Sequence, residues 1–215
     1  MGLIVRDPTL HNMPSGYAAF CDLARAGHHA HTMGFHGKNG DVSRFAARFR
    51  VAKSFEGIAL EGYTNETVNG YNALLRVFLV WSAFERFMAL IQETPQTILP
   101  RLRAYAPARN IQAIRKHDRS QLWLSFLTER VNSKLRKQLE AIRSGTSNNI
   151  TFFAAAARHI FAHGHLSAHA NGADPRDVDA ICGILFSFHM NVMDKEFDRV
   201  VGKHKQRLPN QTNGE

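Results

Sequence analysis

The sequence predicts an all-α protein, and three observations support this prediction. Apolar residues recur at steps of three and four positions over long stretches, which is the spacing of one face of a helix. Residues that start and stop helices flank these stretches, such as Thr64 before the first and Pro95 after it. Hydrophobic residues make up 44% of the 215 residues and charged residues 21%, the balance of a globular protein with a buried core. No apolar run approaches the ~20 residues of a membrane-spanning helix.

The first predicted helix extends from Thr64 to about Gln92. A short stretch punctuated by Pro100 and Pro107 follows it and is not assigned a helix. The second helix is expected over residues 120–143, before Gly145. The apolar faces of these two helices consist of Leu74, Phe78, Trp81, Phe84, Met88 and Ile91 in the first, and of Leu122, Phe126 or Leu127, Val131, Leu135 and Leu139 in the second.

Two further helices complete the predicted core. The third runs over residues 149–163, and Gly164 stops it. The fourth begins with Asp174 as its cap and Pro175 in its first turn, and continues to about residue 205. We expect these four helices to form an up-and-down bundle over residues 63–205.

The chain outside the bundle is expected to differ from it. Residues 1–62 form an N-terminal extension of uncertain structure. Within it, residues 27–40 hold four glycines and four histidines, which favours a loop. The tract from His28 to His36 could also chelate a metal, but a flexible loop that merely contains histidine is the favoured interpretation. Residues 43–60 fit a helix or a strand equally well. Residues 206–215 are polar and are expected to be a flexible tail.

The chain carries a formal charge of +9, and this charge is concentrated in one fifth of its length. Residues 101–143 contain eleven bases and only three acids. Such a patch attracts phosphates at long range, and the alternative is a solvated basic face without a partner. We therefore expect RNA to bind through Arg115, Lys116, Arg119, Arg130, Lys134, Arg136 and Lys137.

The start of the sequence and its cysteines favour a cytoplasmic protein. Residues 1–7 lack the basic and then apolar layout of a secretory signal. Cys21 and Cys182 lie far apart and in no metal-like spacing, which fits a reducing compartment.

An arginine followed five positions later by a histidine occurs three times, as Arg6/His11, Arg158/His163 and Arg199/His204. This spacing is common by chance, so the surroundings must distinguish the pairs. Pro8 interrupts the first pair, and the third lies at the basic end of the last helix, where such residues suit the helix dipole. Only the second pair lies inside an apolar helix, where a charge is costly unless it has a partner or a task.

The segment Arg158-His159-Ile160-Phe161-Ala162-His163-Gly164 resembles the motif of the HEPN family, the higher eukaryotes and prokaryotes nucleotide-binding domain. Flanking helices that contain residues 81–87 and 177–197 extend the resemblance, which covers residues 64–205 by layout more than by residue identity. The resemblance implies a homodimeric, metal-independent endoribonuclease without a cofactor. Bacterial members of the family often act as toxins or phage-defence effectors.

The family's mechanism, carried over to these residues, assigns each a role. His163 would move protons at the ribose 2′-hydroxyl or at the leaving oxygen, and Arg158 would hold the phosphate. Positions five apart on a helix point about 140° away from each other, so Gly164 must end the helix for both to reach one point. Two copies of His163 in a dimer would divide the acid and base roles.

Two departures from the family pattern bear on activity and regulation. His159 stands where the family usually has Asn or Asp; it can bind phosphate or share the proton transfers, or it marks a site that has lost catalysis. In HEPN toxins inactivated by adenylylation, a tyrosine stands two residues after the motif histidine, and here that residue is His165. The resemblance thus gives no ground for that regulation and leaves a partner antitoxin or other regulatory protein open.

Glu85 is a candidate supporting residue, because it lies close to the apolar face of the first helix. It can orient Arg158 through a charge-assisted pair, or simply pair with Arg86 or water.

Two other functions remain open. A HEPN-like bundle can bind RNA, a nucleotide or a protein partner without cleaving. A metal site is the other, because His159, His163, His165 and His169 cluster in eleven residues. That cluster lacks a nearby cysteine and the glutamate of a zinc protease, so we expect no metal.

Overall fold

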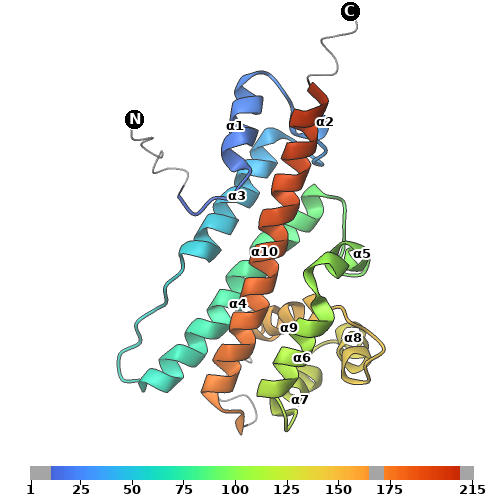
Figure 1. Cartoon of the computed structure of the whole chain (residues 1–215). Helices are drawn as coiled ribbons and strands as arrows, with labels where there is room; N and C mark the ends of the chain where they lie inside the picture. Colours follow the sequence, from blue (N-terminus) through green and yellow to red (C-terminus); the bar gives the residue numbers. More distant parts are fainter. Residues whose placement is uncertain (1–10, 165–171, 209–215) are drawn as a thin grey trace, which may run out of the picture.

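The computed structural model describes residues 11–164 and 172–208, and within these ranges the chain is helical and contains no strand (Figure 1). This confirms the all-α class. The described helices are α1 (Tyr17–Arg25), α2 (Ala30–Met33), α3 (Asn39–Ser54), α4 (Asn65–Leu90), α5 (Leu99–Leu102), the 3₁₀ turn η2 (Arg103–Tyr105), α6 (Pro107–His117), α7 (Leu122–Arg130), α8 (Ser133–Arg143), α9 (Thr151–Ala162) and α10 (Pro175–Arg207).

Helices α4 and α10 form the centre of the molecule and run in the same direction, with α3 and α6 on their flanks running the opposite way (Figure 1). The α4–α10 interface is apolar and aromatic: Trp81 and Phe84 of α4 contact the buried His189 ring of α10 at centroid distances of 6.0 and 4.7 Å. Helices α7, α8 and α9 pack against one another on one side, and α9 joins this group to α4.

Three of the four predicted core helices are confirmed as α4, α9 and α10, because their local start and stop residues act as expected. The Thr64 hydroxyl accepts a hydrogen bond from the Thr67 N–H at 3.3 Å at the start of α4. The Asp174 carboxylate accepts one from the Arg176 N–H at 2.8 Å at the start of α10. Helix α9 ends at Ala162, and Gly164 follows with a φ of 72°.

The single helix expected over residues 120–143 is wrong, because two helices occupy this range. Val131 is extended, with φ −100° and ψ 162°, and its side chain is buried. The Asn132 side chain then accepts a hydrogen bond from the Leu135 N–H at 3.0 Å and starts α8. The apolar spacing continues through the break, but the Asn132 cap and the buried, extended Val131 divide the range into two helices.

The proline-punctuated stretch, for which the sequence predicts no helix, contains α5 and leads into α6. Pro107 occupies the first turn of α6, where its missing N–H would have no partner in any case. Pro100 has the same place in α5. Both prolines therefore lie in the first turn of a helix and do not interrupt one.

The N-terminal residues share the core with α4 and α10. Residues 43–60, for which helix and strand were both open, contain the end of α3, whose Phe45 and Phe49 are fully buried. Phe35 lies against Phe197 of α10, with a ring-centroid distance of 5.0 Å. The glycine- and histidine-rich stretch is more than the expected loop, since it contains α2 with Ala30 buried.

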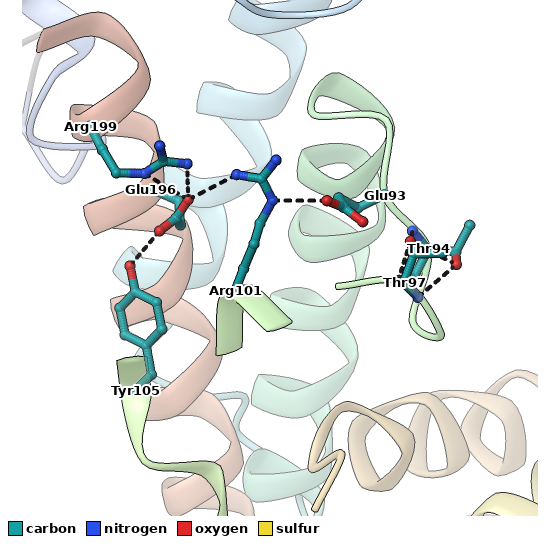
Figure 2. A network of polar contacts seen from close by, with 7 residues as sticks. All are labelled: Glu93, Thr94, Thr97, Arg101, Tyr105, Glu196 and Arg199. Atoms are coloured by element: carbon teal, nitrogen blue, oxygen red, sulfur yellow. Dashed lines mark hydrogen bonds and ion pairs between the residues drawn. The ribbon is translucent and has the colours of Figure 1, made fainter. Parts of the chain in front are cut away.

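A buried carboxylate links α10 to the elements after α4 (Figure 2). Glu196 is 7% exposed and accepts hydrogen bonds from the Tyr105 hydroxyl at 3.0 Å and from Arg199 Nε at 3.0 Å. Arg101 reaches the same carboxylate at 3.5 Å and donates to Glu93 at 2.8 Å. The network fixes the connection between α4 and α6.

No helix in the described part of the chain is long and apolar enough to cross a membrane.

Candidate functional site

The motif predicted from sequence lies at the exposed end of α9. The His163 N–H donates to the His159 carbonyl at 3.2 Å, and the Gly164 N–H donates to the Phe161 carbonyl at 3.1 Å. These bonds close the last turn while Gly164 takes the left-handed conformation that ends the helix. His163 therefore caps the helix and is exposed to solvent.

The structure brings the two motif histidines together. The rings of His159 and His163 lie with centroids 4.4 Å apart, one turn of α9 from each other. Arg158 and His159 are half-buried, and Arg158 makes no ion pair with any residue of the described ranges. The neighbouring Phe161 packs on Phe78 of α4 at a centroid distance of 4.7 Å, which anchors this end of the helix. A cationic guanidinium and two imidazoles are thus presented on a fixed helix end.

The Arg199/His204 pair on α10 has the same spacing and different surroundings. Arg199 is held by the Glu196 carboxylate. Burial raises the pKa of Glu196, but the hydrogen bonds from Arg199 and Tyr105 outweigh it and hold that pKa below its ordinary value. The charge of Arg199 is therefore already paired. Arg6 of the remaining pair lies outside the described residues.

Glu85 does not pair with Arg158 in the structure. Its side chain is exposed on α4, and it forms no ion pair within residues 11–164 and 172–208. The adjacent Arg86 instead bonds Asp41 at the start of α3. Of the two readings of Glu85 that the sequence left open, the geometry fits the solvated one.

The basic residues predicted to bind RNA divide into two groups. Arg115 donates to the Ile142 carbonyl at 2.7 Å and Arg136 to the Thr128 carbonyl at 2.9 Å, so both satisfy backbone groups at helix ends. Arg130 lies over the Phe126 ring at 4.1 Å. The other group consists of Lys116, Arg119, Lys134 and Lys137, which are exposed, as Arg115 and Arg136 also are; of these four, Arg119 donates to the Lys116 carbonyl at 3.3 Å.

A small basic pocket of about 120 Å³ lies between α6, α7 and α8. Arg115, Arg119 and Arg143 line it, together with the buried Asp118, whose carboxylate accepts the Trp123 and Leu124 N–H groups at 3.0 and 2.9 Å. Arg143 is one of the eleven bases of residues 101–143 but is not among the predicted RNA-binding residues. Nothing in the local sequence marks it, because its place depends on how α8 packs.

His189 lies in the core, fully buried against Trp81 and Phe84 of α4. Its Nδ1 lies 2.6 Å from the Leu185 carbonyl, and its Nε2 is buried without a hydrogen-bond partner. Burial lowers its pKa to about 4, so the ring is neutral at pH 7. Its role is packing between α4 and α10.

Within the described ranges, no group of three or more His, Cys, Asp or Glu side chains could hold a metal ion. His165 and His169, two members of the histidine cluster singled out above, lie outside those ranges.

No family model matches the chain, and no curated protein or solved structure matches it. The resemblance to HEPN proteins therefore rests on the Arg158–Gly164 segment and on the helical layout.

Proposed function

We propose that the chain is a HEPN-type, metal-independent endoribonuclease whose site comprises Arg158, His159 and His163. The observation that carries this proposal is the end of α9, where the rings of His159 and His163 lie 4.4 Å apart and Arg158, next to His159 in the sequence, has no acidic partner in the described structure. These are the groups that phosphodiester cleavage needs without a metal: a cation for the phosphate and a titratable acid and base.

The reaction is an attack of the ribose 2′-oxygen on the adjacent phosphorus. One imidazole takes the 2′-hydroxyl proton as the O2′–P bond forms, and a protonated imidazole donates a proton to the 5′-oxygen as the P–O5′ bond breaks. Arg158 stabilises the charge that develops on the phosphoryl oxygens. The products carry a 2′,3′-cyclic phosphate and a 5′-hydroxyl.

A homodimer of HEPN-like bundles would place two α9 ends on one groove, so that two copies of His163 divide the acid and base roles. The exposed position of His163 leaves it accessible to a second chain. Lys116, Lys134 and Lys137, exposed on α6 and α8, would hold the RNA backbone. Within this proposal the enzyme works in the cytoplasm, as a toxin or phage-defence effector under the control of a partner protein.

The test is cleavage of a mixed RNA substrate in EDTA by the intact protein and by Arg158→Ala and His163→Ala. We expect products with 2′,3′-cyclic phosphate ends from the intact protein alone. Cleavage that survives both substitutions would contradict the site. Salt-sensitive RNA binding without cleavage would assign the chain to the non-catalytic binding modules instead.

A further inference from the structure

Two histidines far apart in the sequence face each other where the N-terminal segment meets the end of α10. His28 Nδ1 and His204 Nε2 lie 3.4 Å apart, and the ring centroids are separated by 5.1 Å. Both side chains are half-buried. They line a pocket of about 400 Å³ together with His29, Thr32 and Arg207.

The backbone around His28 is fixed on both sides. Its N–H donates to the Leu23 carbonyl at the end of α1, at 3.0 Å. Its carbonyl accepts from the Asn39 side chain at 3.2 Å, and the same side chain accepts from the Ala30 N–H at 2.6 Å. His28 therefore occupies a defined place between α1, α2 and α3 rather than a position on a free loop.

The His204 ring is held in the same region. It lines the same pocket as Thr32 and Arg207. No acidic side chain pairs with either ring within the described part of the chain.

The separation of the two nitrogens fits a shared metal ion. Two imidazole nitrogens bound to tetrahedral Zn²⁺ at about 2.0–2.1 Å are about 3.3 Å apart. The C-terminal end of α10 favours a cation, whereas the Arg207 charge opposes one, so we expect weaker binding than at a four-ligand structural site.

We infer that His28 and His204 form a two-histidine site for a divalent transition-metal ion of the Zn²⁺ class. Imidazole suits Zn²⁺, Cu²⁺ and Ni²⁺ better than Ca²⁺ or Mg²⁺, which prefer oxygen. Water would occupy the other coordination positions. Metal binding would replace the hydrogen bond between the two rings, which must rotate about their side-chain torsions to aim both lone pairs at one point. Bound metal ties α10 to the N-terminal segment, 176 residues away in the chain.

The test is calorimetric titration of the tag-free, full-length protein with Zn²⁺, together with thermal unfolding. We expect His28→Ala and His204→Ala each to remove one equivalent of Zn²⁺ or to weaken its binding at least about tenfold. For the intact protein, saturation at a hundredfold excess over Kd raises Tm by about 5–10 °C. His28→Gln and His204→Gln, which keep the size of the side chain, must show the same loss with unchanged circular dichroism.

Matched controls separate this site from the other histidines. His36 lies in the same glycine-rich stretch as His28, but its ring bonds the Gln92 side chain. The variant His36→Ala should therefore keep the Zn²⁺ equivalent. His163→Ala should also keep the Zn²⁺ equivalent. Removal of Zn²⁺ from the His28/His204 site by EDTA should not abolish RNA cleavage. An equivalent that persists in both His28→Ala and His204→Ala would overturn the inference, as would a protein that takes up no Zn²⁺. An equivalent lost only in His29→Ala/His31→Ala would also overturn it, in favour of that neighbouring stacked pair.

Discussion

The ends of α9 and α10 carry the same spacing of arginine and histidine in opposite surroundings. On α10, Arg199 is bonded to the buried Glu196, and His204 faces His28. On α9, Arg158 has no acidic partner among the described residues, and His163 lies at an exposed helix end. The difference shows that the spacing alone carries no chemistry. Whether an acidic side chain lies beside the arginine, as Glu196 does one turn before Arg199 on α10, decides whether its charge is already paired within the fold.

The largest expected effect separates the two arginines in catalysis. Arg158→Ala should lower the rate of RNA cleavage in EDTA by about 10²–10³-fold, the cost of removing one donor that stabilises a developing anion. Arg199→Ala should leave the rate of the folded protein within about threefold, because its guanidinium is engaged by Glu196. Single-turnover kinetics on one RNA measures both, and equal losses would break the comparison.

In stability, the residues around Glu196 on α10 should matter more than the exposed residues near the α9 site. Glu196→Ala should lower the free energy of unfolding by about 3–5 kcal/mol, because it leaves Arg199, Arg101 and the Tyr105 hydroxyl without their shared acceptor. Glu85→Ala, an exposed glutamate on α4, should cost no more than about 0.5 kcal/mol. Urea denaturation compares the two, and similar costs would show that the network in Figure 2 contributes little.

The third prediction concerns pH and the buried histidine of α10. The pKa of His189 is about 4 in the folded chain, against an ordinary 6.5 when unfolded. Between these values the unfolded chain binds the extra proton, so the contribution of His189 to stability is complete above pH 6.5 and falls by about 3 kcal/mol toward pH 4. His189→Leu should flatten the stability profile over this range, whereas the exposed His163→Ala should not. Parallel profiles for intact protein and His189→Leu would contradict the assignment.

The smallest effect distinguishes two neighbours on α6. Arg115→Ala should destabilise the fold by about 1–2 kcal/mol, because the Ile142 carbonyl loses its charged donor. Lys116→Ala should leave stability unchanged and reduce the slope of log affinity for RNA against log salt by about 1. Thermal unfolding and binding at several salt concentrations check the pair, and an unchanged salt slope would place the RNA elsewhere.

Local sequence predicted those parts of the fold whose determinants are local. The helices α4, α9 and α10 could be placed because their caps, stops and apolar faces lie within the helices themselves. The break at Val131 and the start of α6 at Pro107 could not, since an apolar spacing and a proline each fit two structures. Which of the two structures forms at each position depends on how the segment packs against the core.

The polar side chains likewise fall into those that local sequence predicts and those that depend on contacts between distant parts of the chain. Arg158, His163 and the stop at Gly164 are close in sequence, so the motif and the end of its helix were predictable. The Glu196 network and the contact of His28 with His204 join residues up to 176 positions apart, and no local sequence pattern predicts such contacts.

The comparison of His163→Ala with His204→Ala in RNA cleavage tests the central claim most directly. Both reactions contain EDTA and one RNA substrate, and the circular dichroism of each variant confirms its fold. The account predicts a loss of about 10²-fold or more for His163→Ala, the contribution of one acid–base group, and a rate for His204→Ala close to that of the intact protein. Full activity in His163→Ala, or an equal loss in His204→Ala, would contradict the assignment of the site to the end of α9.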